Sequence, residues 1–475
     1  MTARPLCPAL AALLVVLCPP SVAAHVGSPD IYVDGHAGPY RIFVTVRPPR
    51  VIPGVADVEI LTADSSVSDV RIVPLPLVGP AAQFAPVPDV AARSPEDPRL
   101  FTGHLWMMTI GEWQVRVTVN GDHGSGTLSV PVPTLPQSTL GMNRVVRGVL
   151  IAFMLLLSIG FVVIVAAMVR EARLEPGAAA GPDARRRGRI AGAAAAIVVG
   201  VSILLGNYWW TVEASTYAGY IYKPLEMTPS IDGERLRLSI HDPGWIFTRR
   251  VDDFVPDHDH LMHLFVVSPD LDRFWHLHPS ETSAAAFEQP LPDLPAGRYD
   301  LFADVVHKTG VPETLTASLD VPALNGTPLS GDDSAWEGPA RMSHIAWIRD
   351  AQPLTTKRLT MFTFRVDDES GRPADDLELY MGMPGHAIFV RKDHRVFAHV
   401  HPAGSAPMAS LALTVNPPAH AAHGGQATST HEAHTPTPPT ITFPYGFPEA
   451  GDYRIFVQVK RAGRIETGAF DAHVQ

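Results

Sequence analysis

The sequence predicts a mainly β protein with two transmembrane helices, and three observations carry that prediction. Short runs of alternating apolar and polar residues recur along most of the chain, two long apolar runs lie near its middle, and one histidine pattern occurs twice in its C-terminal half. We expect antiparallel β-sandwich domains, of which the C-terminal two are a tandem duplication. A net charge of −11 and the lack of a long basic block argue against nucleic acid as a partner.

Residues 1–24 have the features of a secretory signal peptide. Arg4 provides a positive start, an apolar stretch follows, and small residues offer a cleavage site before His25. Both cysteines of the chain, Cys7 and Cys18, fall in this segment. The exported chain is therefore expected to have neither disulfides nor thiolate ligands, so a metal site in it must use histidine, methionine, carboxylate or backbone groups.

Two uncharged apolar runs predict transmembrane helices at residues 148–169 and 190–212, each long enough to cross a hydrocarbon core of roughly 30 Å. The connecting loop, residues 170–189, contains six arginines, and such an excess of positive charge marks a loop as cytoplasmic. We therefore expect the lipid bilayer as a partner and the bacterial inner (cytoplasmic) membrane as the location. The bulk of the chain is expected to be extracytoplasmic.

Residues 25–143 are expected to form the first outer domain, called the N-terminal module below. Alternating runs such as 40–46 and 113–119 are separated by turn-forming residues, which is typical of a sandwich of short strands. The run from Gly111 to Val117 resembles the closing strand of YtkA-like or FixH-like immunoglobulin-type domains, which are small envelope modules. This resemblance implies an Ig-like fold, which we also expect for the C-terminal domains.

The C-terminal half contains two similar segments, which we call repeat 1 (230–322) and repeat 2 (340–475). Each has three histidines separated by 13 and then two positions, and the similar strands 297–302 and 451–456 follow them. The two sets are His263, His276 and His278 in repeat 1, and His386, His399 and His401 in repeat 2. Residues 403–440 interrupt repeat 2 with a composition rich in Ala, Pro, Thr and Gly, which predicts a flexible loop.

Each histidine set is expected to lie on one face of a β-hairpin. Centring the first turn after Asp270 places His263 opposite His278 across the ladder. Residues two apart on a strand share a face, so His276 projects beside His278, and repeat 2 gives the same arrangement. Three converging neutral imidazoles suit Cu, Zn, Ni or Fe. The alternative is that these histidines are half-buried sheet residues bonded to backbone groups.

Other side chains bear on the choice of metal. Met383 lies shortly before His386, and thioether plus imidazole without thiolate favours copper, with zinc or another divalent metal as the alternative. His258 and His260 give repeat 1 either additional donors or a solvated loop. His25, as the new N-terminus, would chelate Cu(II) through its amino group and ring, as in copper-carrying β-sandwich proteins of the CopC type.

The sequence thus predicts a membrane-tethered envelope protein that binds copper for delivery, storage or sensing, without catalytic residues. The C-terminal hairpins resemble those of uncharacterised secreted proteins associated with heavy-metal handling, over roughly residues 260–310 and 380–460. Another envelope metal-handling or assembly protein is the expected partner. A metal-free Ig-like scaffold for an envelope complex is the alternative. A cupin-like metal enzyme is disfavoured because Glu281 follows His278 too closely for the cupin motif and repeat 2 has no matching glutamate.

Overall fold

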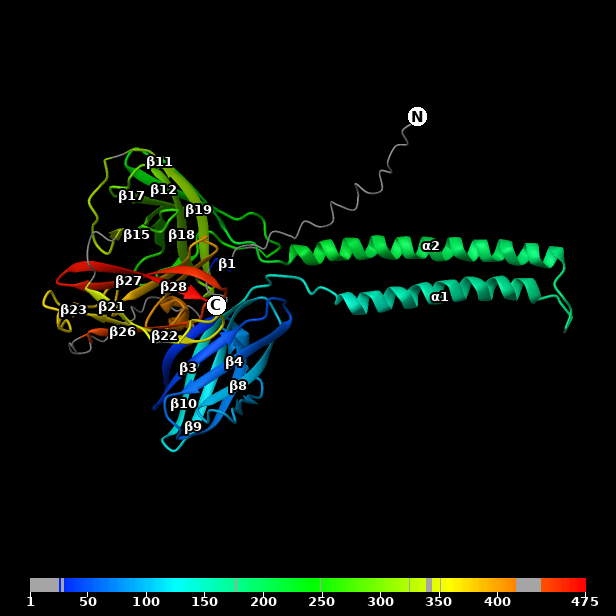
Figure 1. The fold of residues 1–475 in the computed structure, drawn as a ribbon, viewed down its shortest axis with the longest axis horizontal. Helices are drawn as coiled ribbons and strands as arrows, with labels where there is room; N and C mark the ends of the chain where they lie inside the picture. Colours follow the sequence, from blue (N-terminus) through cyan, green and yellow to red (C-terminus); the bar gives the residue numbers. More distant parts are fainter. Residues whose placement is uncertain are drawn as a thin grey trace, which may run out of the picture.

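The chain is mainly β, with two long helices that extend side by side from a body of strands (Figure 1). A computed structural model describes residues 25–26, 30–175, 177–247, 249–323, 325–338, 344–350, 352–415 and 437–475. The signal peptide expected at 1–24 lies outside this part of the chain. All strand pairs among the described residues are antiparallel, except two: β1 with β25, and an isolated bridge between Leu354 and Val474.

The N-terminal module consists of two sheets that share one core. The first sheet has the order β2 (Ile31–Ala37), β3 (Tyr40–Arg47), β4 (Gly54–Thr62), β8 (Leu100–Met107) and β7 (Ala92–Arg93). The second has the order β10 (Gly124–Thr134), β9 (Gly111–Gly121), β5 (Val67–Pro76) and β6 (Asp89–Val90), and the short helix η3 (Pro80–Gln83) follows β5. Alternate residues of both sheets, such as Val44 and Val117, are buried in this core. The strands expected at 40–46 and 113–119 are therefore confirmed.

Helices α1 (Arg144–Glu171) and α2 (Pro182–Gly219) are long and apolar enough to cross a membrane. Both extend beyond the apolar runs. The Asn143 side chain caps α1 by accepting a bond from the Val145 amide at 2.9 Å, and Pro182 occupies the first turn of α2. The helices thus continue into the arginine-containing segment expected as a loop, and only residues 172–181 connect them.

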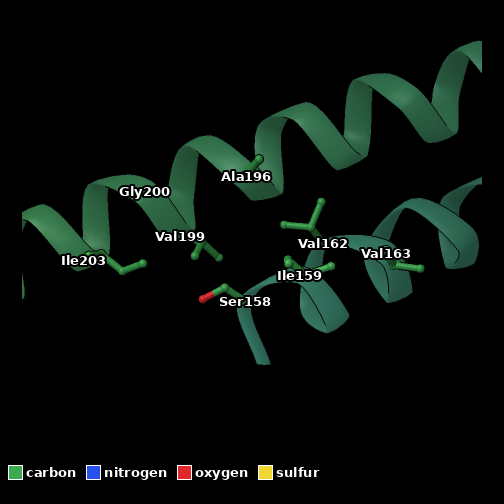
Figure 2. A pocket seen from close by; sticks show the side chains of 8 residues that line it. All are labelled: Ser158, Ile159, Val162, Val163, Ala196, Val199, Gly200 and Ile203. Carbon is green, nitrogen blue, oxygen red and sulfur yellow. The ribbon is translucent and has the colours of Figure 1, made fainter. Parts of the chain in front are cut away.

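The two helices pack closely at the connected end and less closely further along. A Cβ on Gly188 would lie 2.9 Å from the Ala166 carbonyl oxygen, so glycine permits this approach. Further from the connecting segment they leave a hollow, which Figure 2 shows. Its lining consists of Ser158, Ile159, Val162, Val163, Ala196, Val199, Gly200 and Ile203. Apart from Ser158 this lining is apolar, which suits contact with hydrocarbon.

Repeat 1 again has two sheets around a core. The smaller sheet has the order β11 (Glu226–Asp232), β12 (Arg235–His241), β17 (Ala286–Pro290) and β16 (Ser280–Ser283). The larger has the order β13 (Phe254–Val255), β18 (Gly297–His307), β14 (His263–Val267), β15 (Arg273–Leu277) and β20 (Ser334–Glu337), with β19 (Pro312–Val321) paired to β18. Leu238 of the smaller sheet and Leu264 of the larger belong to the same core.

Repeat 2 has the same two-sheet arrangement. The smaller sheet has the order β21 (Ile345–Ile348), β22 (Thr360–Val366) and β26 (Thr440–Tyr445). The larger has the order β1 (His25–Val26), β25 (Val396–Val400), β24 (His386–Arg391), β27 (Gly451–Arg461) and β23 (Leu377–Glu378), with β28 (Arg464–Val474) paired to β27. Phe364 and Phe389 contribute to its core from the two sheets.

The larger sheets of the two repeats pack against each other through a separate apolar layer, which we call the inter-repeat core. Its buried residues are Phe265, Val267, Leu271, Phe274 and Phe302 of repeat 1, with Ile388, Val390, Phe397 and Phe456 of repeat 2. Phe274 stacks on Phe456 and Phe302 stacks on Phe397, each with ring centroids 4.4 Å apart. Strands β14 and β24 are consequently buried on both faces, which explains their nearly continuous apolar sequences.

The segment expected as a flexible loop at 403–440 differs from that expectation at its start. Residues 408–415 form helix α3 (Met408–Val415), and residues 416–436 lie outside the described residues. Ala406 and Leu411 contact the core of the N-terminal module. The apolar stretch Met-Ala-Ser-Leu-Ala-Leu therefore has a core to bury against, and the average composition of the whole segment concealed it.

A carboxyl group is buried where the N-terminal module, repeat 1 and α3 meet. A Cβ on Gly310, in the turn between β18 and β19, would lie 2.5 Å from Leu77, 3.1 Å from Leu413 and 3.4 Å from Glu112. Neither carboxyl oxygen of Glu112 has a hydrogen-bond partner among the described residues. Burial therefore raises the pKa of Glu112 well above its usual value of 4.5.

We predict that Glu112→Gln stabilises the protein increasingly as the pH rises. Because the folded-state pKa is raised, ionisation in the unfolded chain above pH 4.5 lowers the stability of the wild type, by about 1.4 kcal/mol per pH unit until the folded group also ionises. Thermal or denaturant unfolding at pH 4 and pH 8 measures the difference between variant and wild type. An equal difference at both values would contradict the assignment of a neutral buried carboxyl.

Candidate metal centre

The two histidine hairpins have the strand register that the sequence predicts. In repeat 1, Phe265 of β14 pairs with His276 of β15. In repeat 2, Ile388 of β24 pairs with His399 of β25. Since side chains alternate along a strand, Leu264 enters the core of its own repeat while its neighbours face the other repeat. The histidines therefore point into the interface between the repeats.

Histidines of both repeats meet there in one group, which we call the histidine cluster. Its members are His258, His260, His263, His276, His278, His386, His399 and His401. The rings of His263 and His399, from different repeats, have centroids 5.5 Å apart. The two hairpins therefore contribute to one shared region.

Two sets of three histidines in the cluster have the spacing of metal ligands. The repeat-1 group consists of His263, His276 and His278, and the inter-repeat group of His258, His386 and His401. Within each group, one ring nitrogen from every residue lies within 4.8 Å of the others. The inter-repeat group takes His258 from repeat 1 and the other two from repeat 2. A metal ion there would therefore connect the repeats.

Hydrogen bonds around the repeat-1 group determine which ring nitrogens carry protons. His263 Nε2 lies 3.0 Å from the Asp257 carbonyl oxygen, which can only accept, so Nε2 is protonated and Nδ1 has the lone pair. His276 Nδ1 lies 2.9 Å from Gln458 Oε1, so Nδ1 is protonated and Nε2 has the lone pair. These two lone-pair nitrogens face each other at 3.1 Å.

Repeat 2 has the same arrangement with different partners. His386 Nε2 lies 3.1 Å from the Tyr380 carbonyl oxygen and donates to it, so His386 Nδ1 has the lone pair. His399 Nδ1 lies 3.4 Å from Asp304 Oδ2. His386 Nδ1 and His399 Nε2 face each other at 3.0 Å.

The third histidine of each hairpin also presents a nitrogen to the cluster. His278 Nδ1 lies 3.0 Å from Asp333 Oδ1, and its Nε2 is buried without a hydrogen-bond partner among the residues that the structure describes. His401 Nε2 lies 3.2 Å from His258 Nε2. The repeat-1 group therefore contains the facing pair of its hairpin and a third donor. The inter-repeat group contains His386 without its facing partner, and His258 and His401 are its other two donors.

The facing nitrogens, at 3.0–3.1 Å, lie close to the separation of two ligands on one metal ion. Two lone pairs at this distance repel each other when nothing lies between them. A metal bonded to each nitrogen at about 2.0–2.1 Å with a tetrahedral angle would hold the nitrogens about 3.3 Å apart. The carbonyl, amide and carboxylate groups on the opposite nitrogens are the partners that orient histidine ligands in metal sites.

The interior of the cluster keeps the imidazoles neutral, which is the form that binds metal. Burial lowers the pKa of His263, His276, His386 and His399 well below the usual 6.5, and neighbouring histidines add to the effect. Burial likewise lowers the pKa of His401 to about 3. Protonation therefore does not compete for these nitrogens near neutral pH.

The same kind of backbone turn supports each of the two hairpins. Asp257 and His260 exchange two backbone hydrogen bonds, as do Tyr380 and Met383, and the carbonyl of the first residue of each turn accepts from the hairpin histidine. Both turns place their two central residues at positive φ, His258 and Asp259 in one and Met381 and Gly382 in the other. The turns thus have equivalent backbones, but repeat 1 carries imidazoles where repeat 2 carries thioethers.

Three further residues were expected as metal ligands, and the structure places each of them differently from the histidines of the two groups. The His260 ring stacks on the His278 ring with centroids 4.0 Å apart, so it lies beside the repeat-1 group. Met383 is placed by its backbone in the turn before His386. The backbone of His25 pairs with Val396, so β1 extends the hairpin sheet of repeat 2, while the His25 side chain lies outside the described part of the structure.

Sequence reasoning missed the groups that hold the ligand histidines. Gln458 and Asp304 lie on β27 and β18, far from the hairpins in sequence. Gln458 has no exposed surface, and both residues are polar positions within otherwise apolar strand sequences. Such an isolated polar residue in a buried strand was the available signal, because it must have a partner in the interior.

One family model matches the two repeats, and the comparisons with known proteins leave the function open. A family described as a domain of unknown function (DUF8832) matches residues 227–323 and 342–475. No curated protein matches the chain. Solved structures include a bacterial ice-binding adhesin (5% identity, 89% of this chain and 91% of that chain, TM-score 0.14). Another similar structure is a tandem repeat of a large adhesion protein (8% identity, covering 90% of this chain and 72% of that chain, TM-score 0.16). TM-scores this low carry no inference about fold or function.

We predict that Gln458→Leu weakens metal binding at the repeat-1 group by about 10- to 100-fold, because His276 loses the acceptor that orients its ring. Competition with a chromophoric chelator measures the affinity. Gln137→Leu, at an exposed residue before α1, is the control. An unchanged affinity in Gln458→Leu would show that this hydrogen bond does not set the ligand geometry.

Proposed function

We propose that this chain is a membrane-anchored copper-binding protein of the bacterial envelope that holds two metal ions between its C-terminal repeats. One observation carries the proposal. In each repeat two buried histidine nitrogens face each other at 3.0–3.1 Å, and in repeat 1 the other nitrogen of each ring is hydrogen-bonded outward. A structural histidine pair would share a proton in a hydrogen bond, whereas the outward bonds in repeat 1 leave a lone pair on both facing nitrogens.

Copper fits the donors better than most metals. The ligands are imidazoles, both cysteines of the chain fall in the proposed signal peptide, and copper has the highest affinity of the divalent first-row metals for nitrogen sites. Met381 and Met383 in the turn of repeat 2 add soft thioether groups near the inter-repeat group. Zinc accepts the same imidazole set and is the main competitor.

The proposed location rests on the helices and their flanking charges. The two apolar helices are joined by a segment with six arginines, which favours a cytoplasmic connection, an inner-membrane location and strand domains on the outer side. We also propose that the three strand domains are Ig-like sandwiches. The proposal that repeats 1 and 2 are a tandem duplication is supported by their equivalent turns and by the paired phenylalanine stacks.

The burial of the ligands favours holding, delivering or sensing a metal over catalysis on a large substrate. His263, His276, His386 and His401 are each at most 2% exposed. A metal in the cluster would therefore reach another molecule only after the surrounding segments move. Another envelope metal-handling or assembly protein is the proposed partner.

The decisive measurement is the metal content of the full-length protein in detergent after exposure to Cu(I), Cu(II) or Zn(II) and removal of free metal. We expect about two ions per chain. His276→Ala and His386→Ala should each lose about one ion, because each removes a nitrogen of a facing pair and one histidine of a group of three. The double variant should retain almost none.

His473→Ala is the matched control, because His473 lies on the exposed surface beside Asp452 and outside the cluster. It should bind as the wild type does. If wild type and cluster variants retain equal amounts of metal, or none, the proposal is wrong. A metal-free scaffold would then be the better interpretation.

A second prediction concerns the orientation in the membrane. The proposed mature chain lacks cysteine, so a single cysteine can report the side on which a residue lies. In intact spheroplasts, a membrane-impermeant maleimide should label Ser330→Cys and should not label Ala179→Cys until the cells are lysed. The reverse pattern would overturn the proposed topology.

A further inference from the structure

The N-terminal module is attached to the repeats at the ligands of the inter-repeat group. The chain following His401 forms a short edge beside β2, in which the Asp34 amide donates to the Ala403 carbonyl and the Ser405 amide donates to the Tyr32 carbonyl, both at 2.8 Å. We call residues 403–406 the docking segment. Its last residue, Ala406, is buried in the core of the N-terminal module.

His401 is held to this docking segment by a closed turn. The His401 amide donates to the Gly404 carbonyl at 2.8 Å, and the Gly404 amide donates to the His401 carbonyl at 2.9 Å. Gly404 has φ +128°, and a Cβ there would lie 1.8 Å from the Tyr32 carbonyl oxygen. A displacement of the His401 backbone would therefore also move Gly404, which is in contact with Tyr32 of β2.

His258, the ligand from repeat 1, has a similar connection through its neighbour Asp257. The Asp257 carboxylate accepts a hydrogen bond from the Ala409 amide of α3 at 2.7 Å. Helix α3 packs on the N-terminal module through Leu411. Two of the three histidines in the inter-repeat group therefore lie next to backbone segments on which the module docks.

Tyr32 provides a further contact between the N-terminal module and repeat 2. Its side chain belongs to the core of that repeat, and its hydroxyl donates to the Gly446 carbonyl at 3.4 Å. The docked module is therefore fixed to both repeats close to the cluster. Its C-terminal end leads directly through residues 135–143 into α1, while α2 leads through residues 220–225 into repeat 1.

We propose that metal occupancy of the inter-repeat group is coupled to docking of the N-terminal module, so that binding is transmitted to the relative position of α1 and α2. This inference rests on the proposed function and selects sensing among its roles. A metal bonded to His258 and His401 fixes Asp257 and the docking segment, which stabilises the docked module. By linkage, undocking must weaken metal binding at this group by the same factor.

The test uses the full-length chain with His276→Ala as background, so that the inter-repeat group supplies the measured ion. Cysteines at Asp122 and Glu369, both exposed, carry spin labels that report the distance between the N-terminal module and repeat 2. Cu(I) or Zn(II), which are diamagnetic, are the probes. We expect metal to increase the docked population, and His401→Ala to abolish that response.

Gly404→Ala supplies the reciprocal measurement, because the added Cβ meets the Tyr32 carbonyl while all three histidine side chains of the group are retained. We expect a smaller docked population and an affinity weaker by about 5- to 150-fold, the usual range of coupling. Gly371→Ala is the control, since Gly371 also has positive φ, +77°, but faces open space. Ser405→Ala, which removes only the hydroxyl that accepts from the Tyr32 amide, is a milder variant should Gly404→Ala misfold.

The outcomes separate this inference from the proposed function. Wild-type affinity in undocked Gly404→Ala or Ser405→Ala, or a metal-independent distance in a chain that binds metal, would overturn the coupling and leave metal binding intact. A chain that binds no metal at all would overturn both. Equal losses in Gly404→Ala and Gly371→Ala would assign the effect to general destabilisation and also reject the coupling.

Discussion

The structure depends on one constraint, which is that the larger sheets of both repeats are buried on both faces. Phenylalanine stacks hold the sheets together along one part of the interface and exclude water from it. A polar side chain in the remaining part must then find a partner in the protein or a ligand, because an unsatisfied buried polar group costs about 1–3 kcal/mol. The histidine cluster occupies that remaining part. The outward nitrogens of His263, His276 and His386 find protein partners, and a nitrogen of each hairpin's first histidine faces a nitrogen of the second.

This constraint explains why elements far apart in sequence converge on the site. Gln458 and Asp304 come from the strands that flank the hairpins, and each serves a histidine of the opposite repeat. Tyr380 and Asp257 serve the histidines of their own repeats through backbone carbonyls. Neither repeat alone contains the full set of groups that orients its ligands. The site is therefore a property of the pair of repeats.

Many strands and turns could be predicted from the sequence, but the packing of the two repeats and the N-terminal module against one another could not. Strict alternation indicated strands such as β3 and β9, and the polar turns fixed the pairing of Phe265 with His276. The sequence showed two separate hairpins but contained no sign that they face each other. The continuous apolar run through β24 was the available hint, because a strand exposed on one face would alternate. Helix α3 was missed because its burial depends on contact with a distant module.

The difference between the two supporting turns has a consequence for how the cluster would fill. Two identical repeats would offer two positions of equal free energy, and ions would distribute between them at random. Here His258 and Asp259 of one turn stand where the other has Met381 and Gly382. If metal binds there as proposed, the two positions differ in affinity, and the first ion to arrive settles in the stronger one. The exchange of imidazole for thioether side chains between turns with equivalent backbones would then give the two repeats an order of loading.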